Sequence, residues 1–231
     1  MKDFIYGVST TKHGNMSFKY GNENEVNNNR KIFLSELGIR LEDCASTWVQ
    51  GEDEIAEVVS ADKGKMFKVD ALVTSERDLG LFMVTADCFP VVIHDPIQKN
   101  LAMMHLGRAG ANKKLVLKTI KLLTQKYKSQ IKDMQVIIGP GIRKESYLFK
   151  DVTQKDDPEW KPYLNILENG MTSVDLAGFI KNHLIGAGIP TKNITDCGID
   201  TAKDKNYFSH YRSVRSGEPE GRFATVVLQR F

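Results

Sequence analysis

The chain has 231 residues, and its 32 lysines and arginines nearly balance 29 aspartates and glutamates, for a formal net charge of +3. This balance argues against a nucleic-acid partner, which usually needs a concentrated basic face. No apolar run approaches the roughly 20 residues that span a bilayer, and the N-terminus lacks a signal-peptide pattern, so no membrane partner is expected. Cys44, Cys88 and Cys197 are odd in number and widely spaced. They predict a reducing, cytoplasmic location rather than a disulfide framework.

The first half of the chain predicts one helix followed by a series of strands. Apolar residues on one helical face begin at Val26 and end at Leu37, and Gly38 follows as a stop signal. Apolar runs typical of strands come next, at 46–50, 54–60, 70–75, 81–87, 90–95 and 100–107. Several of these runs are separated by turns too short for a crossover helix, so antiparallel pairing should be common.

The second half mixes helices, strands and one long loop. Apolar residues recur at helical spacing from Ala111 to Tyr127, and Ser173 can cap a later helix that ends near Gly186 or Gly188. The other segments are a strand at 134–140, a short helical turn at 143–149, a loop at 151–170, and strands at 193–199 and 221–229. We therefore expect one domain over residues 1–231. Its class should be α+β (mixed α/β), a layered sandwich of mixed β-sheets flanked by helices.

Polar residues stand at the end of two apolar strands. Asp87 and Cys88 follow the strand LFMVTA, and Pro90 lacks the backbone donor that a β-ladder needs. The strand NLAMMHLG ends at His105, directly before GRAG. If the two strands are neighbours, a thiol and an imidazole face one cleft, where such a pair binds zinc or acts as nucleophile and base. Taken singly, the same residues are typical of a buried cysteine, a core histidine and a turn aspartate.

Several longer motifs occur in one order over nearly the whole chain, from about Phe4 to Phe231. They are VDALVTS, TADCFPVVI, MMHLGRAG, VIIGPGIRKESY, VDL, YFSHYR and EGR. In this combination the chain resembles the family described as laccase-domain proteins, multicopper polyphenol oxidases and peptidoglycan editing factors, which is also treated as a purine nucleoside phosphorylase family. The resemblance implies cleavage of adenosine, inosine, guanosine or methylthioadenosine with phosphate, and adenosine deaminase activity beside it. The implied partners are the nucleoside and phosphate, and the implied assembly is a monomer or weak homodimer.

The resemblance also implies a zinc centre made by two histidines and a cysteine. Cys88 and His105 occupy two of those positions, and Asp87 could orient a ligand beside them. Gln50 stands where the family has its first histidine, and an amide is a poor zinc ligand beside imidazole or thiolate. His13, in the N-terminal motif, is the candidate substitute. Copper is less expected than zinc, because five histidines are too few and too scattered for a multicopper oxidase.

Basic side chains within the resembling motifs are expected to line a phosphate site, since phosphorolysis needs positive charge around that anion. These are Lys12, Arg30, Arg108, Arg212 and Arg222. Lys12 replaces a family arginine, and Ala109 replaces another. Because of these departures, two other readings stay open. One is a non-catalytic binding protein, and the other is a cysteine hydrolase of a cell-wall precursor with Cys88 as nucleophile and His105 as base.

Overall fold

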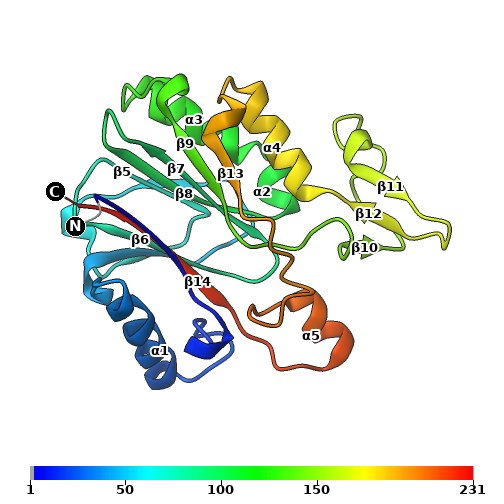
Figure 1. Ribbon diagram of the computed structural model, residues 1–231, viewed down its shortest axis with the longest axis horizontal. Coiled ribbons are helices and arrows are strands. Elements are labelled where there is room, and N and C mark those ends of the chain that lie inside the picture. Colours follow the sequence, from blue (N-terminus) through cyan, green and yellow to red (C-terminus); the bar gives the residue numbers. More distant parts are fainter. Residues whose placement is uncertain (1–2, 231) are drawn as a thin grey trace.

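Two large β-sheets lie face to face, and helices cover their outer faces, in the computed structural model, which describes residues 3–230 (Figure 1). The five-stranded sheet has the order β1 (Phe4–Val8), β14 (Phe223–Gln229), β6 (Gly80–Thr85), β2 (Cys44–Thr47) and β4 (Met66–Phe67). The six-stranded sheet has the order β13 (Ile194–Asp196), β9 (Gln135–Ile138), β7 (Phe89–Asp95), β8 (Asn100–Leu106), β5 (Ala71–Thr74) and β3 (Ile55–Glu57). Both sheets contain parallel and antiparallel pairs.

The space between the sheets is filled by alternate side chains of their strands, because successive side chains point to opposite faces of a strand. Leu81 and Met83 of β6 meet Val92 of β7 and Met103 of β8 in this layer, and none of the four has exposed surface. This apolar layer joins the two sheets, so residues at the ends of β6, β7 and β8 are held at one edge of the sandwich.

Helices cover the two outer faces. Helix α1 (Glu23–Glu36) packs Phe33 and Leu34 on the five-stranded sheet. It begins at the cap Asn22, whose side chain accepts a hydrogen bond from the Glu25 backbone N–H at 2.9 Å. The six-stranded sheet is covered by α2 (Arg108–Asn112), α3 (Leu115–Gln125) and α4 (Leu176–Gly186). Helix α5 (His210–Ser216) lies apart from both helical layers (Figure 1).

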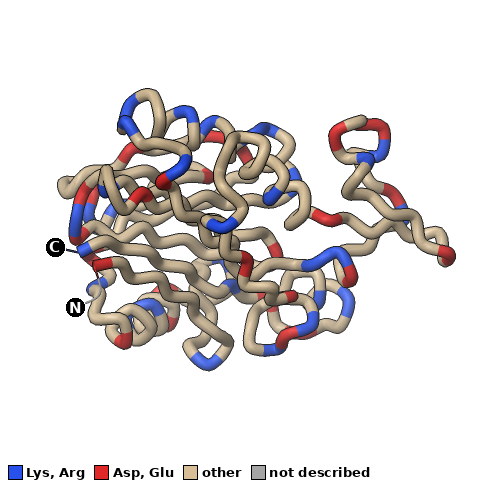
Figure 2. Tube along the Cα trace, turned by 45° about the horizontal axis from the view of Figure 1, so that its top comes forward, with Lys and Arg blue, Asp and Glu red and all other residues tan. Residues whose placement is uncertain are grey.

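A small third sheet projects from the body of the molecule on the side of α4 (Figure 1). Its order is β10 (Leu148–Phe149), β12 (Thr172–Val174) and β11 (Leu164–Ile166), with antiparallel pairing throughout. Lysines, arginines and acids alternate around the outline of the whole chain, while the central strands carry few of them (Figure 2). Among residues 3–230, the helices are all too short or too polar to cross a bilayer.

The α+β layered sandwich and the frequent antiparallel pairing are confirmed, but four local predictions were wrong. The expected helix 111–127 is two helices, broken at Lys114, whose φ of 63° is left-handed. Ser173 lies in β12 and its hydroxyl donates to the Lys144 carbonyl, so it does not cap a helix. Asp175 caps α4 instead. The segment 143–149 forms a turn and β10 rather than a helical turn. The expected loop 151–170 contains β11, which pairs with β12.

Candidate active site

Strands from both sheets end close together at one edge of the sandwich. Strands β2 and β6 run parallel, with Ser46 opposite Phe82, so their carboxyl ends meet. Strands β7 and β8 are antiparallel, and their register places His105 opposite Pro90, two residues after Cys88. Strand β5 lies on the other side of β8. These pairings gather the loop after β2, the turn after β6, the end of β8 and the start of β5.

Asp70, directly before β5, organises this edge. Its carboxylate is fully buried, and its Oδ1 lies 2.8 Å from Nδ1 of His105. The same carboxylate accepts three backbone hydrogen bonds, from the N–H groups of Gln50 at 3.0 Å, Gly51 at 3.0 Å and Glu52 at 2.9 Å. The residue types alone did not single out Asp70. The available signal was an acid opening an otherwise apolar strand, but only the fold shows its partners.

Cys88 and His105 are adjacent at this edge. A Cβ atom built on Gly107 would lie 2.8 Å from the Cys88 Sγ and 4.0 Å from the His105 Cε1, so the three residues converge. Burial opposes protonation of His105, but Cys88 and then the Asp70 carboxylate outweigh it and raise the imidazole pKa to about 10. With Nδ1 held by Asp70, Nε2 is the nitrogen left to face Cys88. These two partners therefore favour the protonated form of the imidazole.

This donor set does not fit a catalytic zinc centre, which uses three protein ligands. The Gln50 side chain is exposed and turns back along the loop after β2, where its amide donates to the Trp48 carbonyl at 2.9 Å. His13 packs on α1, with Nε2 3.2 Å from Glu36 and its ring against Phe33. Within the part of the chain that the structure describes, no three His, Cys, Asp or Glu side chains are arranged to hold a metal. Cys88 and His105 could therefore supply two zinc ligands, but the described residues place no third ligand beside them.

Asp87 positions other elements. Its φ of 76° is left-handed, which an aspartate tolerates better than most residues. Its Oδ1 accepts from the Thr201 hydroxyl at 2.7 Å, and its Oδ2 accepts from the Tyr211 backbone N–H at 2.6 Å. The carboxylate therefore fastens the first turn of α5 and the 201 turn to the end of β6, next to Cys88.

Three of the five expected phosphate-binding cations are largely engaged in holding the fold. Arg30 donates through Nε and Nη2 to the Met16 carbonyl and is 5% exposed, and burial lowers its pKa to about 10. Arg212 donates to two backbone carbonyls and to Glu218. Arg222 donates to Glu220, to a carbonyl and to a tyrosine hydroxyl. The structure does not gather these three side chains around Cys88.

Arg108 and Tyr147 lie at the same edge of the sandwich as Cys88. Arg108 directly follows Gly107, and its guanidinium donates a hydrogen bond to Gln154 at 3.2 Å. Its guanidinium lies over Phe149, 4.5 Å from the ring centre, and 5.6 Å from that of Tyr147. The Tyr147 pKa is raised, first by burial and then by the charge of Cys88, while Arg108 opposes this rise. The fifth cation, Lys12, is exposed beside His13, away from this group.

Comparison with known proteins points in one direction. The family model for multi-copper polyphenol oxidoreductase laccase matches residues 5–230. The purine nucleoside phosphorylase YlmD of Bacillus subtilis is 23% identical over 250 residues, covering 98% of this chain and 88% of that protein. A purine nucleoside phosphorylase of Mycobacterium tuberculosis is 30% identical over 160 residues, and the chain spans 61% of its length. The crystal structure of YlmD from Geobacillus stearothermophilus has the same fold, with a TM-score of 0.90 at 24% identity, over 100% of this chain and 93% of that one.

Proposed function

Because the chain belongs to the multi-copper polyphenol oxidoreductase laccase family, we propose that it is a cytoplasmic purine nucleoside phosphorylase. Its proposed substrates are adenosine, inosine, guanosine or methylthioadenosine together with phosphate, with adenosine deamination as an accompanying activity. The support is twofold: relatives named purine nucleoside phosphorylase match most of the chain, and the edge at His105 carries an acid suited to the reaction.

The observation that carries the proposal is the contact chain from Asp70 through His105 to Cys88. In phosphorolysis a phosphate oxygen bonds to C1′ of the ribose while the C1′–N9 bond breaks and its electron pair moves onto the purine. A proton must then reach the purine ring for the base to leave neutral. His105 is held protonated by its surroundings, so its Nε2–H can supply that proton. The products are the free base and ribose 1-phosphate.

Arg108 is the proposed phosphate ligand. A guanidinium has five N–H donors, and the contacts of Arg108 with Gln154 and Tyr147 use only some of them. Stacking on Phe149 fixes its plane without using a donor. A guanidinium fixed in this way can donate two parallel hydrogen bonds to two oxygens of a phosphate. Tyr147 lies against the same guanidinium and brings a hydroxyl to that side of Cys88.

The test is product analysis of the purified chain with adenosine or inosine, with and without phosphate. We expect free base and ribose 1-phosphate that depend on phosphate. His105→Gln should lower kcat/KM by about 100-fold or more, whereas His210→Gln, at a 56% exposed side chain, should not. Inosine made from adenosine without phosphate would support the accompanying deaminase activity. No turnover by folded protein would overturn the phosphorylase proposal.

One alternative has a specific observation behind it. An aspartate, a histidine and a cysteine in this order, without a third metal ligand among residues 3–230, also suit a cysteine hydrolase. Cys88 would attack an acyl or amide carbonyl of a cell-wall precursor, and water would release the acyl-enzyme. A covalent adduct on Cys88 seen by mass spectrometry, lost in Cys88→Ser, would favour this function. Inactivity in both assays would favour a non-catalytic binding protein.

A further inference from the structure

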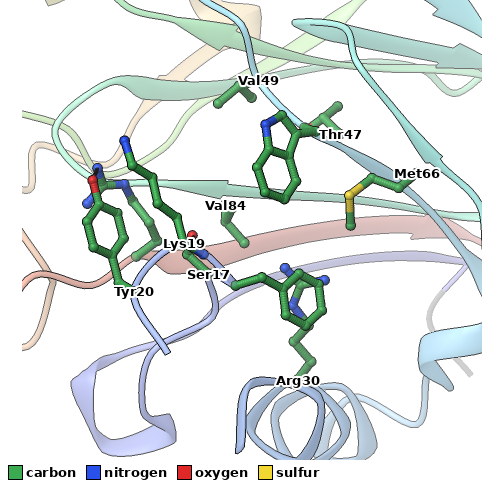
Figure 3. A pocket seen from close by; sticks show the side chains of 11 residues that line it. Ser17, Lys19, Tyr20, Arg30, Thr47, Val49, Met66 and Val84 are labelled. Atoms are coloured by element: carbon green, nitrogen blue, oxygen red, sulfur yellow. Dashed lines mark hydrogen bonds between the residues drawn. The ribbon is translucent and has the colours of Figure 1, made fainter. Parts of the chain in front are cut away.

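A hollow of about 200 Å³ opens between the segment 17–20, α1 and the residues that follow β2. In Figure 3, Lys19 and Tyr20 stand on one side of it, Thr47 and Met66 on the other, and Arg30 rises from α1 below. Its volume is below the range of about 300–1,000 Å³ usual for drug-sized ligands. The hollow can therefore hold one ring system, and the rest of a larger ligand would lie outside it.

Aromatic side chains line the hollow and two of them are held by arginines. The Arg30 guanidinium lies 4.1 Å from the centre of the Phe18 ring. Arg222 lies 4.4 Å from the centre of the Tyr20 ring and also donates to its hydroxyl at 3.0 Å. Trp48 adds an indole that is 43% exposed although it is large and apolar. Fixed rings beside an exposed indole form a stacking surface for a planar ligand.

The charge of the hollow is positive. Its lining contains Lys19, Arg30 and Arg222 and no acidic residue. Arg222 is balanced by Glu220 at 2.9 Å. Arg30 bonds to a neutral carbonyl, and neither it nor Lys19 forms an ion pair within the described residues. Two cationic groups are thus left without a protein counter-charge, which favours an anionic ligand.

We propose that the hollow beside Trp48 is a binding site for a small planar aromatic anion. Its ring stacks on Trp48 and Tyr20, and its negative group faces Lys19 and Arg30. Nucleoside monophosphates and simple aromatic carboxylates share this chemistry. The site does not require that phosphorolysis occurs at His105, although Trp48 lies two residues before Gln50, whose N–H is bound by Asp70.

Tryptophan fluorescence can test the site directly, because the chain has two tryptophans in different environments. Trp160 is fully buried and stacked on Phe179 at 3.9 Å, so Trp48 supplies the emission that solvent and ligands can reach. The titrants are AMP, benzoate, adenosine and inorganic phosphate. We expect saturable quenching of the Trp48 emission by AMP or benzoate. The tighter-binding of the two shows whether the ligand is a nucleoside monophosphate or an aromatic carboxylate. Adenosine alone and phosphate alone should bind at least about tenfold more weakly.

Matched variants separate the anion contact from general charge. Lys19→Met should weaken binding of the anionic titrant by about fivefold, whereas Lys31→Met, which removes an exposed charge on α1 outside the lining, should not. Trp48→Phe should abolish the quenching and leave a spectrum dominated by Trp160. The proposal is overturned if neither anion quenches folded protein, if adenosine binds as tightly as AMP, or if the two lysine variants behave alike.

Discussion

Asp70 and His105 are 35 residues apart in the chain, yet the Asp70 Oδ1 lies 2.8 Å from the imidazole Nδ1. The same carboxylate holds the loop 50–52 through three backbone N–H groups. The buried Asp70 carboxylate therefore fixes the orientation of both the His105 imidazole and the loop 50–52. Four testable consequences follow from this edge of the sandwich.

Replacing Asp70 should destabilise the fold. Asp70→Asn puts an amide NH₂ where one carboxylate oxygen accepts hydrogen bonds, so a donor faces buried donors. We expect a loss of about 3 kcal/mol in the free energy of unfolding, measured by urea denaturation. Asp53→Asn removes a surface ion pair with Lys118 and should cost about 0.5 kcal/mol or less. Equal effects of the two substitutions would contradict the role assigned to Asp70.

The raised pKa of His105 should make stability depend on pH. Below pH 6.5, the ordinary value, the imidazole is protonated in both the folded and the unfolded chain, and its contribution is complete. As pH rises toward about 10, the unfolded chain loses this proton first, so the stabilisation falls. The stability difference between wild type and His105→Gln should narrow by on the order of 2 kcal/mol over this window.

The control for that measurement is His210→Gln, whose side chain is mostly exposed. Its unfolding free energy should run parallel to that of the wild type from pH 6.5 to 10. If the difference in unfolding free energy between wild type and His105→Gln stays constant over the same range, folding does not raise the pKa of His105.

Restoring a histidine at position 50 should create a better zinc site. Cys88 and His105 supply two ligands, and Gln50→His adds imidazole to the loop that Asp70 holds next to them. Zinc affinity, measured by competition with a chromophoric chelator, should rise by at least about tenfold. The double variant Gln50→His, His105→Ala should lose that gain. An unchanged affinity in Gln50→His would show that the loop does not face the pair.

Asp87 should matter for α5 more than for the whole fold. Asp87→Asn keeps the left-handed backbone, which asparagine also tolerates, but weakens the acceptor of the Tyr211 N–H. Hydrogen exchange of the Tyr211 amide should be faster by about tenfold, with a global loss of about 1 kcal/mol. Asp151→Asn, at a 77% exposed side chain, should change neither. Unaltered exchange in Asp87→Asn would contradict the fastening of α5.

Local patterns in the sequence were enough to predict the layered α+β class and the strands that end near Cys88 and His105. Alternation of apolar residues identifies strands, and an apolar helical face followed by a glycine identifies α1, with Gly38 at a φ of 66°. The same patterns missed β1, β4, β11, β12 and α5, and they joined α2 to α3. These elements are short, so few periodic residues mark them, and their ends depend on packing.

Local patterns identify the reactive side chains that stand at strand ends, because alternating burial and turn residues act over a few neighbouring positions. The role of each side chain depends on contacts that form only in the folded chain. The fold joins Asp70 to His105, turns Gln50 back along the loop after β2, and uses Asp87 and Arg212 to hold backbone. These partners lie far apart in the chain or on different elements. Hydrogen bonds between them are set by strand register and sheet packing, which no local pattern specifies.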